Sequence, residues 1–267
     1  MGIPKIVGIL NVTADSFSDG GLYLEPSAAL EKARALIAQG ADIIDIGAES
    51  SRPEAQKVSA QEEIDRLIPV IKSLKQEKIT LSVDTYKPEV MRQVLEMGVD
   101  MINDITALKD PASVEIVKQY TVPVVILYSR GQGPQADRTV REHRYLMNEI
   151  IRFFADRIDT LTGSGIKLEN IIIDPGMGFF LGGNPEPSLM VLKHLKELKR
   201  LGVQLYLSTS RKSFIGTILH REVSKRSAGT LATEIWASLQ GVDYLRTHEV
   251  EPLRDALRML QAIQEME

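Results

Sequence analysis

The 267-residue sequence contains no cysteine, which excludes disulfide bonds, thiolate metal ligands and a cysteine nucleophile. It has no apolar run near the ~20 residues that a membrane-spanning helix needs. Its N-terminus lacks the basic and apolar segments of a secretion signal. The net charge of −4 gives no general attraction to nucleic acid or to an anionic membrane. We therefore expect a cytoplasmic protein with no nucleic-acid partner and no membrane partner.

What the sequence does contain is typical of a globular protein with a sizeable core. Hydrophobic residues make up 43% of the chain and charged residues 25%. A chain of this length suits one (β/α)₈ barrel, which typically takes about 250 residues. Because no break in composition marks a boundary, we expect residues 1–267 to form a single domain.

Short apolar runs alternate with helical patterns along the whole chain. The clearest run is Ile171-Ile172-Ile173, which predicts a strand buried on both faces and ending at Asp174, because Pro175 cannot donate to a sheet ladder. Other strands are predicted at residues 5–10, 42–46, 80–83, 101–102, 122–127, 203–207 and 243–247. Helices are predicted at residues 26–39, from 59, and at 88–98, 111–120, 139–161, 185–201, 227–239 and 251–267.

Eight strand–helix units in strict alternation predict an α/β fold of the (β/α)₈ or TIM barrel type. An open, doubly wound sheet is the alternative. Trp236 lies within the apolar pattern of the helix at 227–239, so we expect it in the core. His143, His194 and His220 have no matching partner in the sequence and are expected at the surface or in packing positions.

Polar residues gather where the predicted strands end, which is where such barrels carry their function. They are Asn11, Ser51, Arg52, Asp84, Asn103, Asp174, Ser210, Arg211, Lys212, Arg246 and His248. Each alone has an ordinary explanation, because Asn and Asp are common in turns and charged residues near strand ends are usually solvated. Together they favour a ligand site at one mouth of the barrel.

The acceptors in this set are Asp84, Asn103 and Asp174. They suit a flat heterocycle with adjacent N–H and NH₂ groups, because a carboxylate can accept two parallel hydrogen bonds from such an edge. Lys212 could donate to the acceptors of the same ring. It could also form a Schiff base, so a sugar-phosphate aldolase is one alternative.

The remaining members of the set suit an anion. Arg246 and His248 share one face of their strand, and Asn11 offers an uncharged oxygen ligand. This combination fits a phosphate or diphosphate with Mg²⁺. A zinc centre is not expected, because the set contains a single histidine.

Seven stretches, in order along the chain, resemble the signatures of the dihydropteroate synthase family. They are residues 8–21, 47–53, 82–85, 102–104, 174–179, 210–216 and 246–248. The resemblance implies a (β/α)₈ barrel and a transferase of folate biosynthesis. Such an enzyme joins 4-aminobenzoate to 6-hydroxymethyl-7,8-dihydropterin diphosphate, giving 7,8-dihydropteroate and pyrophosphate. The resemblance also implies Mg²⁺ as cofactor and a homodimer.

The resemblance further implies a role for each matching residue. The pterin would be held by Asp84, Asn103, Asp174 and Lys212, and the diphosphate by Asn11, Arg246 and His248, with Asn11 also reaching Mg²⁺. The aminobenzoate would be framed by Ser51, Pro53, Phe179, Lys212 and Ser213, with Arg52 in the same loop. The expected catalytic residues are Asp84, Lys212, Arg246 and His248.

Several positions depart from the family pattern and predict an altered pocket wall. They are Ala14 in the first loop, Tyr128 after the fifth strand, Leu181 after the Phe179 motif, and Ser208 on the seventh strand. These departures keep two alternatives open. One is a pterin-binding paralogue with little or no synthase activity, and the other is a pterin-dependent methyltransferase.

Overall fold

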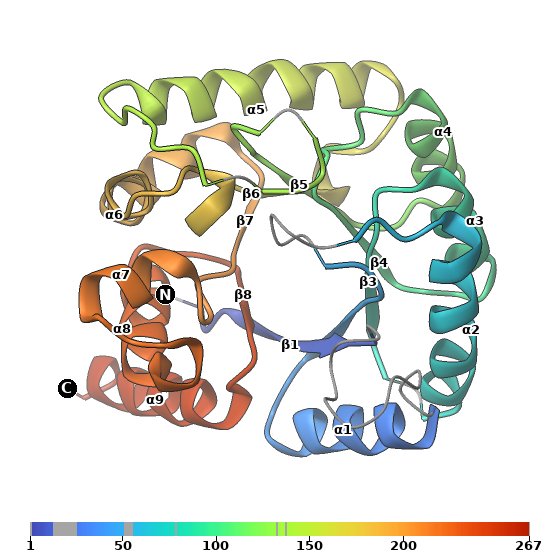
Figure 1. The fold of residues 1–267 in the computed structure, drawn as a ribbon, viewed down its shortest axis with the longest axis horizontal. Helices are drawn as coiled ribbons and strands as arrows, with labels where there is room; N and C mark the ends of the chain where they lie inside the picture. The colour runs from blue at the N-terminus through green and yellow to red at the C-terminus, as the bar shows by residue number, and fades with distance from the viewer. Residues whose placement is uncertain are drawn as a thin grey trace.

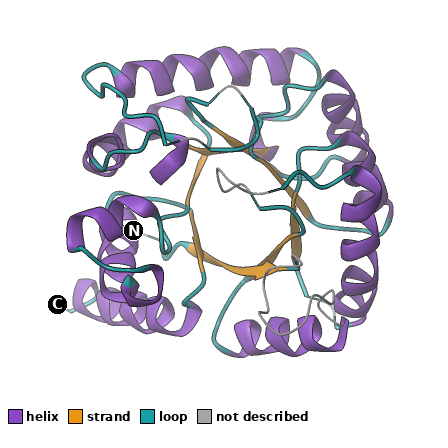
Figure 2. Cartoon of the chain, in the orientation of Figure 1, coloured by secondary structure: helices purple, strands orange, loops and turns teal. Residues whose placement is uncertain are grey.

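The computed structural model describes residues 2–12, 26–50, 56–77, 79–131, 133–136 and 138–266. Its eight parallel strands close into a barrel in sequence order, with β8 pairing back to β1. Helices surround this ring of strands, as Figures 1 and 2 show. The predicted (β/α)₈ barrel is confirmed, and the open sheet is wrong because β1 and β8 are paired with each other rather than left as edges.

The strands are β1 (Lys5–Asn11), β2 (Ile43–Gly47), β3 (Leu81–Asp84), β4 (Met101–Asp104), β5 (Val124–Leu127), β6 (Ile171–Asp174), β7 (Gln204–Leu207) and β8 (Tyr244–Thr247). The α-helices are α1 (Pro26–Ala38), α2 (Ala60–Gln76), α3 (Pro88–Glu96), α4 (Pro111–Tyr120), α5 (Leu146–Gly163), α6 (Glu186–His194), α7 (Ser213–Leu219), α8 (Ser227–Leu239) and α9 (Val250–Gln264). The 3₁₀ helices are η2 (Leu168–Asn170), η3 (Gly178–Phe180), η4 (Leu195–Leu201) and η5 (Val223–Lys225).

Several helices begin where local chemistry predicts. At the start of α2, Glu62 N donates to Ser59 Oγ at 3.2 Å, and Ser59 N donates to Glu62 Oε2 at 2.8 Å, which completes a capping box. Pro88 and Pro111 occupy the first turns of α3 and α4. Proline suits that position, because its missing N–H would have no partner within the helix.

Three predicted boundaries differ from the structure. Helix α5 begins at Leu146 rather than at Thr139, because the preceding segment bonds to another loop: Gly183 N donates to Thr139 O at 2.8 Å, and Arg141 N donates to Asn184 Oδ1 at 3.0 Å. The helix predicted at 185–201 changes to 3₁₀ geometry after His194. A short additional helix, α7, separates β7 from α8.

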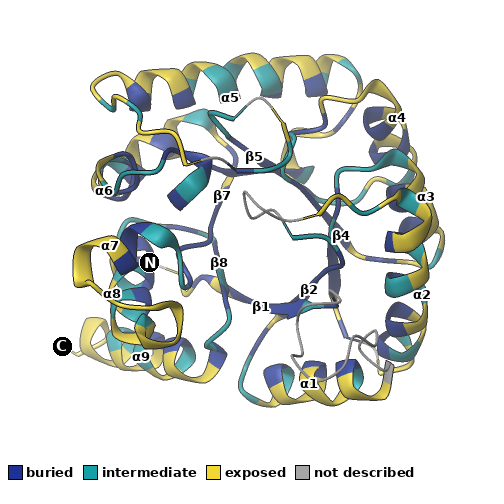
Figure 3. Ribbon diagram, in the orientation of Figure 1, coloured by how far each residue is buried: buried dark blue, intermediate teal, exposed yellow. Residues whose placement is uncertain are grey.

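Alternation along the strands sorts their side chains into two cores. One set packs between the strands and the helices, and includes Leu10, Ile46, Val83, Ile173 and Leu245. The other set fills the barrel interior and consists of Val7, Ile43, Met101, Val125, Ile172, Tyr206 and Tyr244. Figure 3 shows the result, with buried strands inside and exposed residues on the outer helix faces. Within the described residues, no helix is long and apolar enough to span a membrane.

Candidate active site

The polar site is built on the apolar layer inside the barrel. Alternate residues of a strand point to the same side. The residues two positions after Ile43, Met101, Ile172 and Tyr244 therefore also point into the barrel. Those positions are Asp45, Asn103, Asp174 and Arg246. The barrel thus has an apolar floor, and acceptors with one cation lie above it toward the carboxyl ends of the strands.

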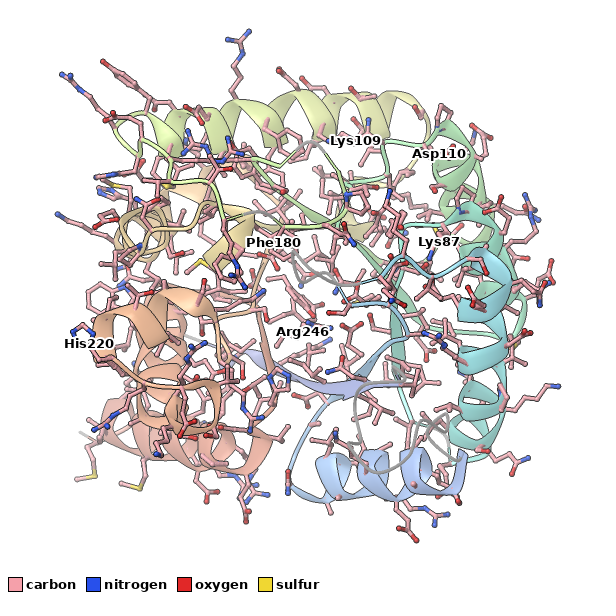
Figure 4. All side chains as sticks on the ribbon, in the orientation of Figure 1. Lys87, Lys109, Asp110, Phe180, His220 and Arg246 are labelled. Carbon is pink, nitrogen blue, oxygen red and sulfur yellow. The ribbon has the colours of Figure 1, made fainter. Side chains whose placement is uncertain are left out.

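Arg246 lies at the centre of this arrangement, inside the barrel (Figure 4). Its Nε donates to Asp45 Oδ2 at 2.6 Å, and a terminal nitrogen donates to Asp84 Oδ2 at 3.0 Å. Asn103 Nδ2 donates to the same Asp45 oxygen at 3.2 Å. Burial alone would lower the pKa of Arg246, but the two carboxylates raise it, so the guanidinium remains charged.

The two carboxyl groups predicted for the site are both shifted toward their neutral form. Burial raises the pKa of Asp84, and Arg246 opposes this shift. Burial also raises the pKa of Asp174 to about 6, although Gly176 N donates to Asp174 Oδ1 at 2.8 Å. The Asp174 carboxylate is therefore mostly ionised at pH 7 while it remains poorly hydrated, which strengthens any hydrogen bond that it accepts. Asp84, with its pKa raised to about 7, is about half ionised at that pH.

Lys212 approaches the same space from the loop after β7. Its Nζ lies 4.9 Å from the centroid of the Phe180 ring, and burial lowers its pKa to about 8 with Asp174 opposing. Gly178 has φ of +64°, and a Cβ added there would lie 3.1 Å from Ser213 Oγ and 3.4 Å from Lys212 side-chain atoms. The glycine therefore lets the loops after β6 and β7 meet.

His248 completes the site from the end of β8. Its Nδ1 lies 3.0 Å from Ser210 Oγ, and its backbone N donates to the same oxygen at 3.1 Å. Burial and the nearby cation Arg246 lower the pKa of His248 to about 3, so its ring is neutral at physiological pH. A neutral imidazole can still donate one hydrogen bond to an anion.

Comparisons with known proteins agree with this geometry. Residues 7–248 match the family described as "Pterin binding enzyme". The chain is 45% identical to the type-3 dihydropteroate synthase of Escherichia coli, over 97% of this chain and 99% of that protein. It is 37% identical to the dihydropteroate synthase of strain K12, over 97% and 91% of the two chains. A structure of Xanthomonas albilineans dihydropteroate synthase with 4-aminobenzoic acid superposes with a TM-score of 0.91, at 39% identity and covering 99% and 94% of the two chains.

The chain belongs to the dihydropteroate synthase family.

Membership of the dihydropteroate synthase family confirms the family resemblance and makes the chain a transferase. It favours the synthase over the methyltransferase and aldolase alternatives, since the relatives named above are synthases. Family membership does not assign roles to individual residues, so those roles remain proposals.

The structure brings together Asp84, Asn103, Asp174, Lys212, Arg246 and His248, which the sequence places at five different strand ends. Asn11 joins them at the rim. A Cβ added at Gly47 would lie 3.9 Å from both Asn11 Oδ1 and Asp84 Oδ2, so these two oxygens flank a space that glycine leaves open.

Two predicted aminobenzoate contacts, Ser51 and Pro53, lie outside the described residues, as do the predicted substrate-binding residue Arg52 and Ala14. Of the others, Ser213 is the first residue of α7 and lies beside Gly178. Phe179 packs beside the cluster of Leu127, Ala136 and Phe180, with the Arg138 guanidinium over its ring at 5.5 Å. The ring under Lys212 is therefore that of Phe180, not Phe179.

Two of the residues that were predicted to alter the pocket wall, Tyr128 and Leu181, point away from the pocket. Tyr128 packs edge-on against Phe153 of α5 at 5.2 Å, and its hydroxyl donates to Glu149 at 3.3 Å. Leu181 is fully buried in the core outside the barrel. The prediction that these residues alter the pocket is wrong. Ser208, which follows the inward-facing Tyr206 by two positions, remains a candidate wall residue.

Sequence reasoning missed two buried members of the site. Asp45 lies within β2 and binds Arg246 and Asn103. Tyr206 lies inside the barrel, and its hydroxyl has no hydrogen-bond partner among the described residues. A signal for Asp45 was present, because a charged residue between Ile44 and Ile46 in a buried strand needs a partner.

Proposed function

We propose that this site joins 4-aminobenzoate to 6-hydroxymethyl-7,8-dihydropterin diphosphate, with the residues below in the named roles. The proposal rests on two groups of side chains that lie side by side in the barrel mouth, one of hydrogen-bond acceptors and one suited to bind an anion. Buried acceptors from Asp45, Asn103 and Asp174 lie deep inside it, and Arg246 of β8 and His248, which directly follows β8, lie beside them. A substrate fits both groups if it has a flat ring with N–H groups for the acceptors and an anionic tail for Arg246 and His248.

The acceptors support a role in pterin binding. Asn103 Oδ1 and Asp45 Oδ1 are buried and have no hydrogen-bond partner among the described residues. Buried acceptors without partners are costly, so a ligand that supplies N–H groups would stabilise them. The Asp174 carboxylate offers a second oxygen beside the one that Gly176 N occupies, and Lys212 offers a donor for the acceptors of the ring.

The cations support a role in binding the diphosphate. In the proposed reaction, the C–O bond to the pterin methylene breaks and pyrophosphate leaves with the electron pair. Arg246 and the N–H of neutral His248 would stabilise the departing anion, while Asp84 and Asp174 would stabilise the positive charge left on the pterin. The arylamine nitrogen then forms the C–N bond and releases a proton to solvent. No protein nucleophile is needed.

Mg²⁺ fits the rim of this site. No group of three or more His, Cys, Asp or Glu residues within the described part of the chain could enclose a metal. Mg²⁺ is commonly held by one or two protein oxygens together with substrate phosphates and water, and Asn11 Oδ1 beside the open space at Gly47 offers such an oxygen. When bound, Mg²⁺ would supply positive charge to the leaving diphosphate.

The aminobenzoate would lie against the loops after β6 and β7. Gly178, Lys212 and Ser213 meet there, and the aromatic side chains of η3 lie alongside. Phe179 stays a proposed contact through its aromatic face, and Ser51, Arg52 and Pro53 stay proposed contacts from the loop after β2. A similar structure, that of the dihydropteroate synthase from Xanthomonas albilineans, contains 7,8-dihydropteroate, which is the product proposed for this chain.

We further propose a homodimer that works in the cytoplasm. Helices α6, α7 and α8 lie side by side at the left of Figure 1. They expose Leu189, Leu219 and Trp236 by 45%, 44% and 46%. Trp236 was expected in the core and is not buried; its Nε1 donates to Leu192 O at 2.8 Å, which fixes the ring at the surface. A second copy of the chain would cover this apolar face.

Release of pyrophosphate tests the proposed reaction. The purified chain, incubated with both substrates and Mg²⁺, is expected to release pyrophosphate, and chelation of Mg²⁺ is expected to slow the release. No release at saturating substrate concentrations would contradict the proposal. Binding of the pterin without release would instead support the non-catalytic paralogue.

A further inference from the structure

The turn between β7 and α7 contains a strained residue. Lys212 N donates to Thr209 O at 3.1 Å, which closes a β-turn over residues 209–212. Arg211, at the third position of this turn, has φ of +60°. A left-handed residue at that position is usually glycine or asparagine, because longer side chains are strained there. Such strain persists only where the surroundings hold the residue in place, and it is most common at functional sites.

Neighbouring elements hold both the backbone and the side chain of Arg211. Its backbone N donates to Thr230 Oγ1 of α8 at 3.1 Å, and its guanidinium group pairs with Glu249 Oε1 at 3.2 Å. Its carbonyl oxygen accepts from Arg226 Nη1 at 2.9 Å, and Arg226 directly precedes α8. The strained residue is therefore fixed by α8 on one side and by the residue before α9 on the other.

Arg226 binds more than this one carbonyl group. The same Nη1 donates to Lys212 O at 3.3 Å, and Nε donates to Arg221 O at 3.1 Å. The guanidinium group also lies against the backbone of α7, because a Cβ added at Gly216 would overlap it. A guanidinium group presents several donors in one plane, so a single side chain can bind all of these carbonyl oxygens. Arg226 thus connects the turn, α7 and the segment after α7.

The turn carries two side chains of the candidate site, one on either side of Arg211. Ser210 Oγ lies 3.0 Å from His248 Nδ1 and accepts from His248 N at 3.1 Å. Lys212 Nζ lies 4.9 Å from the centroid of the Phe180 ring. Because residues 210 and 212 flank the left-handed residue, a change of φ at Arg211 would rotate one relative to the other. The position of the Lys212 amine therefore depends on the conformation of the turn.

We propose that Arg226 is a positioning residue for Lys212. Its guanidinium group binds the two carbonyl oxygens of the turn, holds Arg211 in the left-handed conformation and so directs the Lys212 amine into the barrel mouth. The inference rests on the proposed function only for the ligand that Lys212 meets there. It adds to the site a residue that lies outside the barrel and acts through the backbone.

The titration of Lys212 reports where its amine lies. Burial lowers the pKa of Lys212 to about 8. Asp174 opposes this decrease, Arg246 adds to it, and Asp84 opposes it. An amine that leaves the site for solvent regains the ordinary pKa of about 10.4. Trace acetylation of the folded chain at several pH values, followed by mass spectrometry of the Lys212 peptide, measures this pKa, because only the neutral amine reacts.

Two variants of the full-length chain displace the Arg226 guanidinium group in different ways. Arg226→Met removes it. Gly216→Ala keeps Arg226 but places a methyl group where the guanidinium group lies, and alanine favours a helix more than glycine does. We expect both variants to raise the pKa of Lys212 to about 9 or higher, toward the value of a solvated lysine. If Arg226→Met fails to fold, Gly216→Ala tests the same contact.

Arg157→Met is the matched control. Arg157 Nε donates to Ala107 O at 2.6 Å, and a terminal nitrogen of Arg157 donates to Leu108 O. Ala107 and Leu108 are also left-handed, with φ of +61° and +53°. The control therefore removes the same kind of contact from the loop after β4. It should lower the midpoint of thermal unfolding about as much as Arg226→Met does, and leave the pKa of Lys212 at about 8.

Binding of a pterin gives a second readout, measured by calorimetry. Affinity is expected to fall about tenfold in Arg226→Met, roughly the loss of one hydrogen bond, and to stay within about twofold in Arg157→Met. A Lys212 pKa that is the same in the wild type, Arg226→Met and Gly216→Ala would overturn the inference. An equal increase in Arg157→Met would also overturn it, as would a wild-type Lys212 that titrates as a solvated lysine.

The outcomes for the two proposals are distinguishable. A chain whose Lys212 pKa responds to Arg226→Met as expected, but which forms no dihydropteroate, contradicts the proposed function alone. An active wild type whose Lys212 pKa responds to neither variant contradicts the role of Arg226 alone.

Discussion

Asp174 illustrates how a single residue acquires function from its surroundings. The β-branched run before it buries the carboxyl group, and Pro175 and Gly176 end the strand immediately after it. Gly176 N occupies one carboxylate oxygen, which fixes the orientation of the other. The result is a buried acceptor inside the barrel that has little access to water.

Asp174→Asn is predicted to weaken pterin binding strongly. The substitution replaces one acceptor oxygen with an NH₂ donor, which would face the N–H donors of the pterin. The expected loss is on the order of 2–5 kcal/mol for a buried, charged hydrogen-bond pair. Isothermal calorimetry with a pterin measures it. Unchanged affinity in this variant would remove Asp174 from the site.

The pH dependence of pterin binding follows from the same carboxyl group. Burial raises the pKa of Asp174 to about 6, so the carboxylate becomes protonated as the pH falls through that value. A protonated carboxyl group cannot accept two parallel hydrogen bonds, so affinity should decline below pH 6. Calorimetry at pH 5 and pH 7.5 checks this, and Asp174→Asn should show a smaller dependence. An affinity that is the same at both pH values would argue against an ionised Asp174 in the complex.

At the residue scale, the sequence predicted the strand-end polar residues because each interrupts an apolar run. Asp84, Asn103, Asp174 and Arg246 were all found this way. The partner of Arg246 could not be predicted, since Asp45 lies 201 residues away and only closure of the barrel brings them together.

At the scale of elements, a buried ion cluster connects the loop after β2, helix α2 and the residues directly before α3. Lys87 Nζ contacts Glu49 Oε2 and lies 2.5 Å from Glu63 Oε2. Tyr86 OH donates to Glu49 at 3.3 Å. The Glu63 side chain is 1% exposed, and burial raises its pKa while Lys87 opposes. A cavity of about 10 Å³ separates this cluster from Asp84, so the cluster forms the wall of the site on that side.

Lys87→Met is predicted to destabilise the protein, because it leaves two buried carboxylates without their cation. The expected decrease in the free energy of unfolding is about 3–5 kcal/mol. Lys72→Met, on the exposed face of helix α2, which also carries Glu63, is the control and should change stability by less than about 0.5 kcal/mol. Chemical denaturation of both variants gives the comparison. Equal stabilities would show that the cluster contributes nothing.

The sequence also predicted most elements, because apolar spacing, caps and prolines are local signals. It failed where a distant segment decides the outcome. The start of α5 depends on hydrogen bonds between residues 139–141 and residues 183–184, which no local pattern encodes. Trp236 was misplaced because the helix pattern gives the apolar face but not whether another helix or another molecule covers it.

At the scale of the whole molecule, closure of the barrel turns scattered residues into one site. Asn11 ends the first strand and His248 follows the last, and these two strands are neighbours because β1 pairs with β8. The strict strand–helix alternation predicted this architecture, and the pairing order confirms it. That residues 1–267 behave as a single domain stays a prediction, which limited proteolysis of the intact chain would test.

Trp236→Glu is predicted to convert a dimer into a monomer, because it places a charge in the apolar face formed by α6, α7 and α8. Light scattering after size-exclusion chromatography measures the mass. Met259→Glu on α9, also exposed but outside that face, is the control and should leave the mass unchanged. A wild type with monomer mass, or a dimer that survives Trp236→Glu, would contradict the proposed interface.

Formation of 7,8-dihydropteroate tests the central claim most directly. Mass spectrometry of a reaction containing the chain, the pterin diphosphate, 4-aminobenzoate and Mg²⁺ is predicted to show this product accumulating together with pyrophosphate. Asp174→Asn should abolish most of it. A correctly folded wild type that binds the pterin but forms no dihydropteroate would contradict the account.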